Sequence, residues 1–188
     1  MDESSKLHVV DNIYSSSIKE TFYGSVRKLY VCGNSNCKFK TSQIDEVPYF
    51  VIPADGSVIG GVKSIARTTS SVFLCDKCKL NIMHSCTTSI WHQPKCSILL
   101  VNRFIQCPNG NVTKSGTALY CDQKVDVPGF KGQLISFITH LGLSTTSGHY
   151  MASVLNNSKW YRCNDASVTL TNQNFHSNEV YLLFYIKE

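Results

Sequence analysis

The chain carries the stretch SGHYMASVLNNSKWYRCND at residues 147–165, and this stretch predicts a β-hairpin. One strand begins at His149, the chain turns at 156–158, and the strand KWYRCND returns antiparallel to the first. A hairpin of this length brings Asn164 and Asp165 back beside His149, while Gly148 leaves the approach to the imidazole open. The stretch therefore predicts a histidine paired with a carboxamide or a carboxylate.

Such a pair is half of a cysteine-nucleophile site. A thiol of this kind needs a histidine within hydrogen-bond reach, so that a thiolate exists near neutral pH. It also needs an Asp or Asn that holds the imidazole in the right tautomer. From the hairpin alone, a histidine that merely packs beside Tyr150 is the commoner arrangement.

The composition limits the classes of protein to be considered. A chain of 188 residues, 43% of them hydrophobic, can bury one solid core, and only 16% charged residues argue against wholesale disorder. The net charge of +5 is scattered without a run of basic residues, so we expect no nucleic-acid partner. No apolar run approaches the length of a membrane span, and the N-terminus lacks a secretory pattern. We therefore expect no membrane association and an intracellular location, in the cytoplasm, the nucleus or both.

The chain predicts a β-rich α+β fold with mostly antiparallel strands. Residues 1–21 read as a polar leader, and residues 57–67 as a short helix weakened by its two adjacent glycines. Runs rich in Val, Tyr and Phe between turn signals predict strands at 25–32, 49–53 and 71–75, and a strand buried on both faces at 95–105. Closely spaced strands with few helices give this class.

Two close cysteine pairs predict a metal site. CGNSNC supplies Cys32 and Cys37, and CDKC supplies Cys75 and Cys78. Two pairs brought together by hairpins offer the four thiolates that structural zinc prefers. An odd total of nine cysteines without a secretory route also favours metal over disulfides.

The other cysteines have less specific contexts. His84 and Cys86 follow the second pair and could substitute if the first pair fails to close the site; otherwise they are strand residues. Single cysteines at strands or strand ends are expected to pack as small hydrophobes: Cys96, Cys107, Cys121 and Cys163.

Several segments, in order, resemble the ubiquitin-specific proteases, which are papain-like deubiquitinases. They are FYGSVRKLYVCGNSNC, FLCDKC, WHQPKCSILLVNRF, LISFITHLGLSTTSGHYMASV, KWYRCNDASVT and NEVYLLFYIK. The resemblance covers residues 22–186. It implies a papain-like cysteine protease palm at 95–188 and a zinc-ribbon fingers subdomain at 22–94.

The resemblance also implies an activity, partners and roles. The activity is thiol-dependent removal of ubiquitin by hydrolysis after its C-terminal glycine. His149 would be the general base, Asn164 would orient it, and Asp165 could assist the same histidine or the oxyanion. Cys32, Cys37, Cys75 and Cys78 would form the zinc quartet. The fingers would grip ubiquitin, and the palm would receive its tail.

The nucleophile is where the resemblance breaks. The family carries it in an N-terminal box followed by a helical thumb, and the 21 residues before Phe22 are too few for both. Cys37 occupies the slot of the first zinc pair, and strand alternation points Cys163 away from the site. We therefore expect no thumb and no nucleophile in this chain. It would be a deubiquitinase portion that needs a separate nucleophile segment, or a catalytically inactive ubiquitin-binding module; a zinc-ribbon scaffold unrelated to ubiquitin is a third hypothesis.

Overall fold

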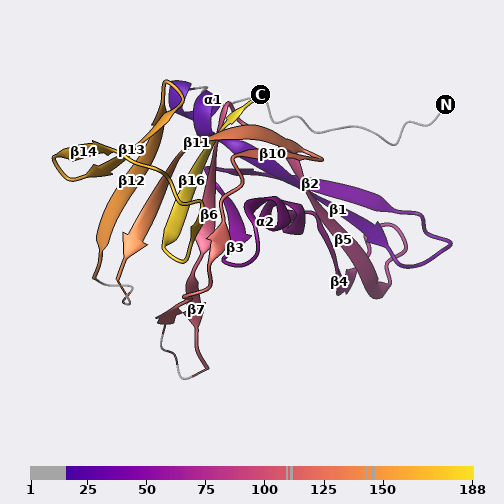
Figure 1. The fold of residues 1–188 in the computed structure, drawn as a ribbon. Coiled ribbons are helices and arrows are strands. Elements are labelled where there is room, and N and C mark those ends of the chain that lie inside the picture. The colour runs from indigo at the N-terminus through magenta and orange to yellow at the C-terminus, as the bar shows by residue number, and fades with distance from the viewer. Residues whose placement is uncertain (1–15, 109, 111, 143, 145–146) are drawn as a thin grey trace.

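The computed structural model describes residues 16–188 except 109, 111, 143, 145 and 146 (Figure 1). The helices are α1 (Ser17–Phe22) and α2 (Val58–Ile65). The strands are β1 (Gly24–Cys32), β2 (Lys40–Val47), β3 (Phe50–Pro53), β4 (Arg67–Leu74), β5 (Asn81–His92), β6 (Cys96–Asn102), β7 (Phe104–Gln106), β8 (Val112–Lys114), β9 (Leu119–Tyr120), β10 (Lys124–Val127), β11 (Phe130–Leu141), β12 (His149–Asn156), β13 (Lys159–Asn164), β14 (Ser167–Leu170), β15 (His176–Ser177) and β16 (Val180–Lys187). The predicted β-rich α+β class is confirmed.

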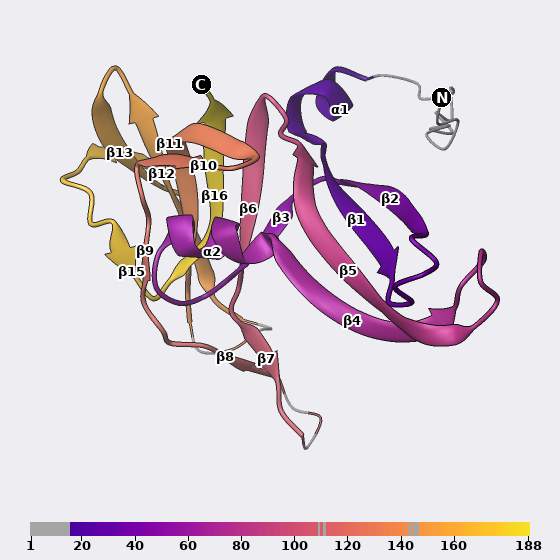
Figure 2. The same cartoon turned by 90° about the vertical axis from the view of Figure 1, so that its right-hand side faces the viewer.

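A four-stranded antiparallel sheet with the order β2-β1-β5-β4 forms an arm (Figures 1 and 2). The turn after β1 and the turn after β4 lie at one end of this sheet, because Cys32 stands opposite His84 and Leu74 stands opposite Asn81. These turns carry the two cysteine pairs. The four-stranded sheet therefore corresponds to the fingers subdomain that the resemblance predicts.

The larger sheet has the order β14-β13-β12-β11-β16-β6-β3, with β10 paired to β11. Its pairs are antiparallel except β3 with β6. A parallel neighbour needs a long crossover, and here the crossover runs through α2, β4 and β5. Consequently β3 is a strand of the larger sheet and α2 packs on it, although both lie within 22–94, the range that the resemblance assigns to the fingers.

One face of the larger sheet is packed against α2 (Figure 2). Val58 and Val62 on the helix join a core that includes Phe50 and Leu99. A side chain at Gly61 would press on Ile52 at 3.0 Å, so this glycine allows the close approach of helix and strand. Ser57 caps the helix by accepting a hydrogen bond from the backbone N–H of Gly60. The short helix predicted at 57–67 is confirmed.

Two expectations differ from the structure. The end of the expected leader forms α1, because Ser16 accepts a hydrogen bond from the Lys19 backbone N–H and caps the helix; residues 1–15 lie outside the described residues. The single strand expected at 95–105 breaks at Arg103 into β6 and β7.

Arg103 explains this break. Its side chain is fully buried, and its guanidinium donates to the carbonyls of Val180, Ser115, Thr117 and Ser177. Burial lowers the pKa of this guanidinium, and the carbonyls supply the hydrogen bonds that a buried cation requires. Arg103 therefore ties the two segments around 115–117 and 177–180 to the larger sheet.

Neither described helix has the length and apolar character needed to cross a bilayer.

Candidate functional site

The hairpin predicted at 147–165 is present. β12 and β13 pair antiparallel with Ala152 opposite Cys163, and the connecting turn places Asn157 and Ser158 at positive φ, 47° and 60°. Two consecutive positive-φ residues give the turn whose twist matches the flanking strands. The NNS sequence therefore sets the register that returns Asn164 toward His149.

The side chains of His149 and Asn164 are joined by a hydrogen bond. The distance between Nε2 of His149 and Oδ1 of Asn164 is 2.5 Å, and both side chains are exposed. An amide oxygen only accepts, so Nε2 carries a proton and donates. In the neutral imidazole the lone pair then lies on Nδ1. The structure thus presents Nδ1 as the nitrogen that can accept a proton from a thiol.

Asp165 lies in the turn after β13 with a φ of 47°. Asp and Asn adopt this left-handed conformation more easily than most residues. Its carboxylate makes no hydrogen bond or ion pair with any residue that the structure describes. Of the two predicted partners of His149, the structure therefore brings Asn164 to the ring and not Asp165.

No thiol is bonded to the His149 ring in the described part of the chain, where the only hydrogen-bond partner of the ring is Asn164. All nine cysteines are described and none forms a disulfide. Cys163 precedes Asn164 on β13, so it points to the opposite face of the sheet. Cys37 is buried in the cysteine quartet, with its Sγ 3.8 Å from Sγ of Cys75.

The backbone that leads into His149 is held by residues to which the sequence gave no role. His140 is buried, stands opposite Tyr150 in the β11–β12 register, and has its ring 4.7 Å from that of Tyr150. Lys114 donates from Nζ to the carbonyls of His140 and Gly142, at 2.5 and 2.8 Å. Burial, and secondarily Lys114, lower the pKa of His140. The His-x-Gly pattern at 140–142 was the available sequence signal for this support.

Gly148 is packed so tightly that a methyl group would displace the neighbouring chain. A Cβ there would collide with Nε2 of His140 and lie 2.5 Å from the carbonyl oxygen of Leu141. We expect Gly148→Ala to reduce the free energy of unfolding by about 1–3 kcal/mol, the usual cost of overpacking. The matched control is Gly116→Ala, whose Cβ meets nothing within 4 Å. Denaturant unfolding of both variants checks this, and equal stability would contradict the packing described.

The four predicted metal ligands converge at the tip of the arm. The sulphur atoms of Cys32, Cys37, Cys75 and Cys78 all lie within 4.8 Å of one another, and the first three residues are buried. Sγ of Cys32 lies 3.9 Å from Sγ of Cys78, which is far beyond the disulfide bond length of about 2.05 Å. Lys38 and Lys79, which follow the pairs, have positive φ, and these turns fold each pair around one point.

Two of the sulphur–sulphur separations in the quartet match those of a tetrahedral zinc site. A Zn–S distance of about 2.3 Å gives a separation of about 3.8 Å between tetrahedral sulphurs. The Sγ–Sγ distance is 3.8 Å between Cys37 and Cys75 and 3.9 Å between Cys32 and Cys78, and both distances match this value. These four residues could therefore hold a metal ion.

The thiols of the quartet differ in acidity. Backbone N–H donation, first from Cys78, lowers the pKa of the Cys75 thiol to about 6, with a further contribution from His84. For Cys32 the backbone N–H of Asn34 also lowers the pKa, but burial and the three neighbouring thiols raise it to about 12. Four thiolates in one buried cluster repel one another unless a cation lies between them, so ionisation of the whole set fits metal binding.

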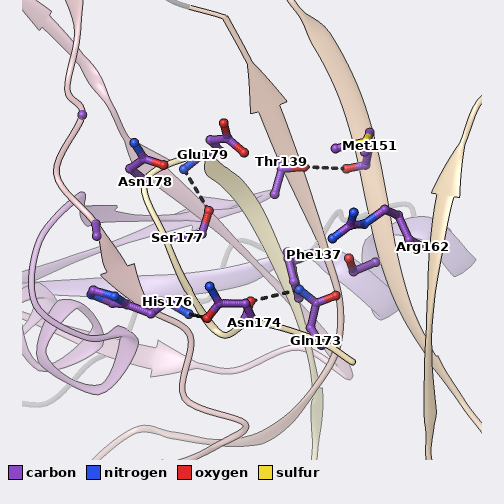
Figure 3. Close-up of a pocket in the computed structure, with 13 residues that line it drawn as sticks. Phe137, Thr139, Met151, Arg162, Gln173, Asn174, His176, Ser177, Asn178 and Glu179 are labelled. Atoms are coloured by element: carbon purple, nitrogen blue, oxygen red, sulfur yellow. Dashed lines mark hydrogen bonds between the residues drawn. The ribbon is translucent and has the colours of Figure 1, made fainter. Parts of the chain in front are cut away.

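A separate hollow of about 410 Å³ lies over β11, β12 and β13 (Figure 3). Met151 and Ser153 line it, and they lie on the same face of β12 as His149 because side chains alternate along a strand. Its opposite wall is formed by residues 173, 174 and 176–179. Neither His149 nor Asn164 lines this hollow, so the histidine–asparagine pair lies on the same sheet face but outside it.

With this geometry in place, comparison with known proteins identifies the family. The model of the ubiquitin carboxyl-terminal hydrolase family matches residues 1–185. The chain belongs to this family. The resemblance to ubiquitin-specific proteases is thereby confirmed.

Individual relatives agree with this assignment. The chain is 27% identical over 199 aligned residues to ubiquitin carboxyl-terminal hydrolase 17-like protein B of Mus musculus, covering 93% of this chain and 40% of that protein. It is 26% identical to ubiquitin carboxyl-terminal hydrolase 25 of Arabidopsis thaliana, covering 91% of this chain and 28% of that protein. The chain thus spans less than half the length of these relatives.

Solved structures show the same fold. A SAGA deubiquitinating module containing Ubp8 bound to monoubiquitin matches with a TM-score of 0.80 at 20% identity, over 91% of this chain and 42% of the Ubp8 chain. A yeast SAGA module matches with a TM-score of 0.79 at 20% identity and the same coverage. These matches confirm the papain-like fold with its zinc-ribbon-like cysteine cluster.

Proposed function

We propose that this chain is the base-bearing and ubiquitin-recognising portion of a cysteine deubiquitinase. The observation that carries the proposal is the hydrogen bond from Nε2 of His149 to Oδ1 of Asn164, which leaves Nδ1 to accept a proton. Membership of the ubiquitin carboxyl-terminal hydrolase family supports ubiquitin as the substrate. The protein would act in the cytoplasm, the nucleus or both.

The chemistry is hydrolysis of the bond after the C-terminal glycine of ubiquitin. Nδ1 of His149 takes the proton of the nucleophilic thiol, and the thiolate adds to the scissile carbonyl carbon. The same proton passes to the departing amine, and a thioester with ubiquitin remains. Water then loses a proton to His149 and adds to the thioester carbon. The C–S bond breaks, the ubiquitin carboxylate is released, and the departing thiolate takes the proton back from His149. Asn164 keeps the ring in one orientation throughout, and Asp165 is not hydrogen-bonded to it.

The metal proposed for the quartet is zinc. Four cysteine ligands complete a closed tetrahedral set, which leaves no position for a substrate or a reacting water. Zinc would hold the turn after β1 to the turn after β4 and so fix the end of the arm. Its role would be structural.

We infer that a separate polypeptide segment supplies the thiol. The larger sheet has one buried face, with Leu99, Leu183 and Phe137 each at most 1% exposed. The side chains on its other face are half-buried and mostly apolar, and they form two rows across five strands: Leu100, Leu182, Ile138, Ala152 and Cys163, then Ile98, Phe184, Ser136, Val154 and Tyr161. A half-buried apolar face that spans five strands is typical of a surface that binds another protein segment.

The occupant proposed for this face is the body of the nucleophile-bearing segment of the same catalytic domain. His149 and Asn164 lie on the opposite face, so the end of the segment that bears the thiol would pass around the end of β12, where His149 begins the strand. The relatives are more than twice as long as the part that this chain matches. Burial of these two rows would also stabilise the β12–β13 hairpin that carries His149 and Asn164. Ala152 and Cys163 lie in the first row and are also residues of this hairpin.

A second candidate function is a catalytically inactive ubiquitin-binding module. It is favoured by one observation, that no described thiol is bonded to His149. In this case the arm and the larger sheet would hold ubiquitin without cleaving it.

Binding of ubiquitin tests both candidates. The purified zinc-loaded chain is titrated into ¹⁵N-labelled ubiquitin, and a second titration uses ubiquitin that lacks its C-terminal tail. We expect residue-specific shift changes with both ligands and weaker binding of the truncated one, because the larger sheet would receive the tail. No shift changes with either ligand would contradict a role in ubiquitin recognition.

A further inference from the structure

His84 lies beside the cysteine quartet and is almost completely buried, with 1% of its surface exposed. On β5 it stands directly opposite Cys32 of β1. Its ring stacks on Phe73 of β4, with the centroids 3.7 Å apart and the planes inclined by 14°. Its Nδ1 lies 2.9 Å from the carbonyl oxygen of Ile82, and a carbonyl only accepts, so Nδ1 donates to it. The stacking and this hydrogen bond together fix the orientation of the ring.

The other ring nitrogen lacks a hydrogen-bond partner in the described part of the chain. Nε2 of His84 is buried without one. Buried polar atoms are nearly always paired, and an unpaired one costs free energy. His84 and Cys32 are cross-strand neighbours, so their side chains lie on the same face of the arm, and the sulphur of Cys75 lies within 4.8 Å of that of Cys32. The His84 side chain also helps to lower the pKa of Cys75, after the larger effect of the Cys78 backbone N–H.

We propose that His84 is an outer-sphere residue of the metal centre, whose Nε2–H donates a hydrogen bond to the metal-bound sulphur of Cys75. This assignment rests on the proposed zinc site. The hydrogen bond between Nε2 of His84 and the sulphur of Cys75 would form when the four sulphurs bind the metal. Residues hydrogen-bonded to metal ligands orient those ligands and tune their charge. Such a hydrogen bond would offset part of the negative charge that four thiolates place around one Zn²⁺.

His84 is assigned to the sulphur and not to the metal itself. The group of ligand atoms within 4.8 Å of one another consists of four sulphurs and contains no imidazole nitrogen. Four thiolates already complete the tetrahedral set of structural zinc. The substitution of His84 for a cysteine of the first pair, which the sequence left open, is therefore not needed.

The test measures zinc affinity by competition with a chromophoric chelator at fixed pH. His84→Phe keeps an aromatic ring against Phe73 but removes the N–H, and we expect its zinc affinity to fall by about 10- to 100-fold. His84→Gln keeps an N–H donor and should recover part of this loss. The matched control is His92→Phe, an exposed histidine near the other end of β5, which should bind zinc like the original chain. Equal affinity of His84→Phe and the original chain would overturn the assignment.

A second measurement avoids any folding defect of the variants. The original chain is loaded with ¹¹³Cd, and its NMR spectrum is searched for a coupling from an imidazole N–H through a cysteine sulphur to the metal. A coupling assigned to His84 Nε2–H and Cys75 is expected, and its absence in a fully loaded chain would overturn the assignment. If the chain binds neither zinc nor cadmium, the proposed zinc site is wrong, and the role assigned to His84 is wrong as well. A chain that binds metal but lacks the coupling leaves the zinc site intact.

Discussion

Replacing Cys75 with serine is expected to remove the metal from the chain and to unfold the tip of the arm. Cys75 is fully buried, belongs to the sulphur quartet, and has the most acidic thiol described in it. A structural zinc site of this kind has an apparent binding free energy of roughly 10–16 kcal/mol, and folding depends on it. We therefore expect zinc to fall from about one ion per chain to almost none, and β1, β4 and β5 to lose amide protection.

The matched control for this change is Cys86→Ser. Cys86 is also buried, and it lies on β5 of the same sheet but outside the quartet. It should retain about one zinc per chain, as one tetrahedral site requires. Metal analysis of folded samples and hydrogen exchange give the two readouts. A Cys75→Ser variant that keeps its zinc, or an original chain that never contains any, would contradict the metal centre.

The second large effect is expected at His149. When the chain is combined with the nucleophile-bearing part of a relative, cleavage of a ubiquitin C-terminal amide should fall about 100- to 10,000-fold in His149→Ala, because the general base is lost. Asn164→Ala should lower the rate by a smaller factor, since the imidazole remains but loses the partner of Nε2. The turnover number from steady-state kinetics checks both.

His176→Ala is the control for this series. His176 is exposed on β15 and makes no contact with His149 among the described residues. Its substitution should leave the turnover number within a factor of about two, as for a surface position away from the chemistry. A His149→Ala variant as active as the control would remove this residue from the mechanism.

The sequence predicted the hairpin and the quartet because both depend on local patterns. The NNS turn between two short strands determines how β12 and β13 pair, and this pairing brings Asn164 to His149. The spacing of each cysteine pair likewise determines a tight turn. Each of these turns needs only a few neighbouring residues, so it can be read without the rest of the fold. The meeting of the two cysteine pairs depends in addition on the pairing of β1 and β4 with β5.

Long-range pairing was not available from the same patterns. YFVIP reads as a strand, but nothing in it shows that β3 joins β6 in parallel after a long crossover. The strand expected at 95–105 breaks at Arg103 because distant carbonyls, such as those of Val180 and Ser177, accept from its guanidinium. The tertiary partners decide these features.

Side-chain contacts in the candidate sites also escaped the sequence. The hairpin pattern alone leaves both Asn164 and Asp165 as partners of His149, and the resemblance gives the orienting role to Asn164. The structure shows the hydrogen bond between Asn164 and the ring. The packing of His140 against Gly148 and of His84 against Phe73 depends on strand register. Spacing identifies candidates, and geometry selects among them.

In the proposed function this chain carries the base of a deubiquitinase and another segment carries the thiol. This division is tested by the reaction of the purified, zinc-loaded chain with a ubiquitin probe that has a thiol-reactive group at its C-terminus. We expect no adduct with the chain alone, and an adduct on the added segment when that segment is supplied. An adduct on one of the nine cysteines of the chain itself, lost in His149→Ala, would show that the chain carries its own nucleophile, and peptide mapping would identify that residue.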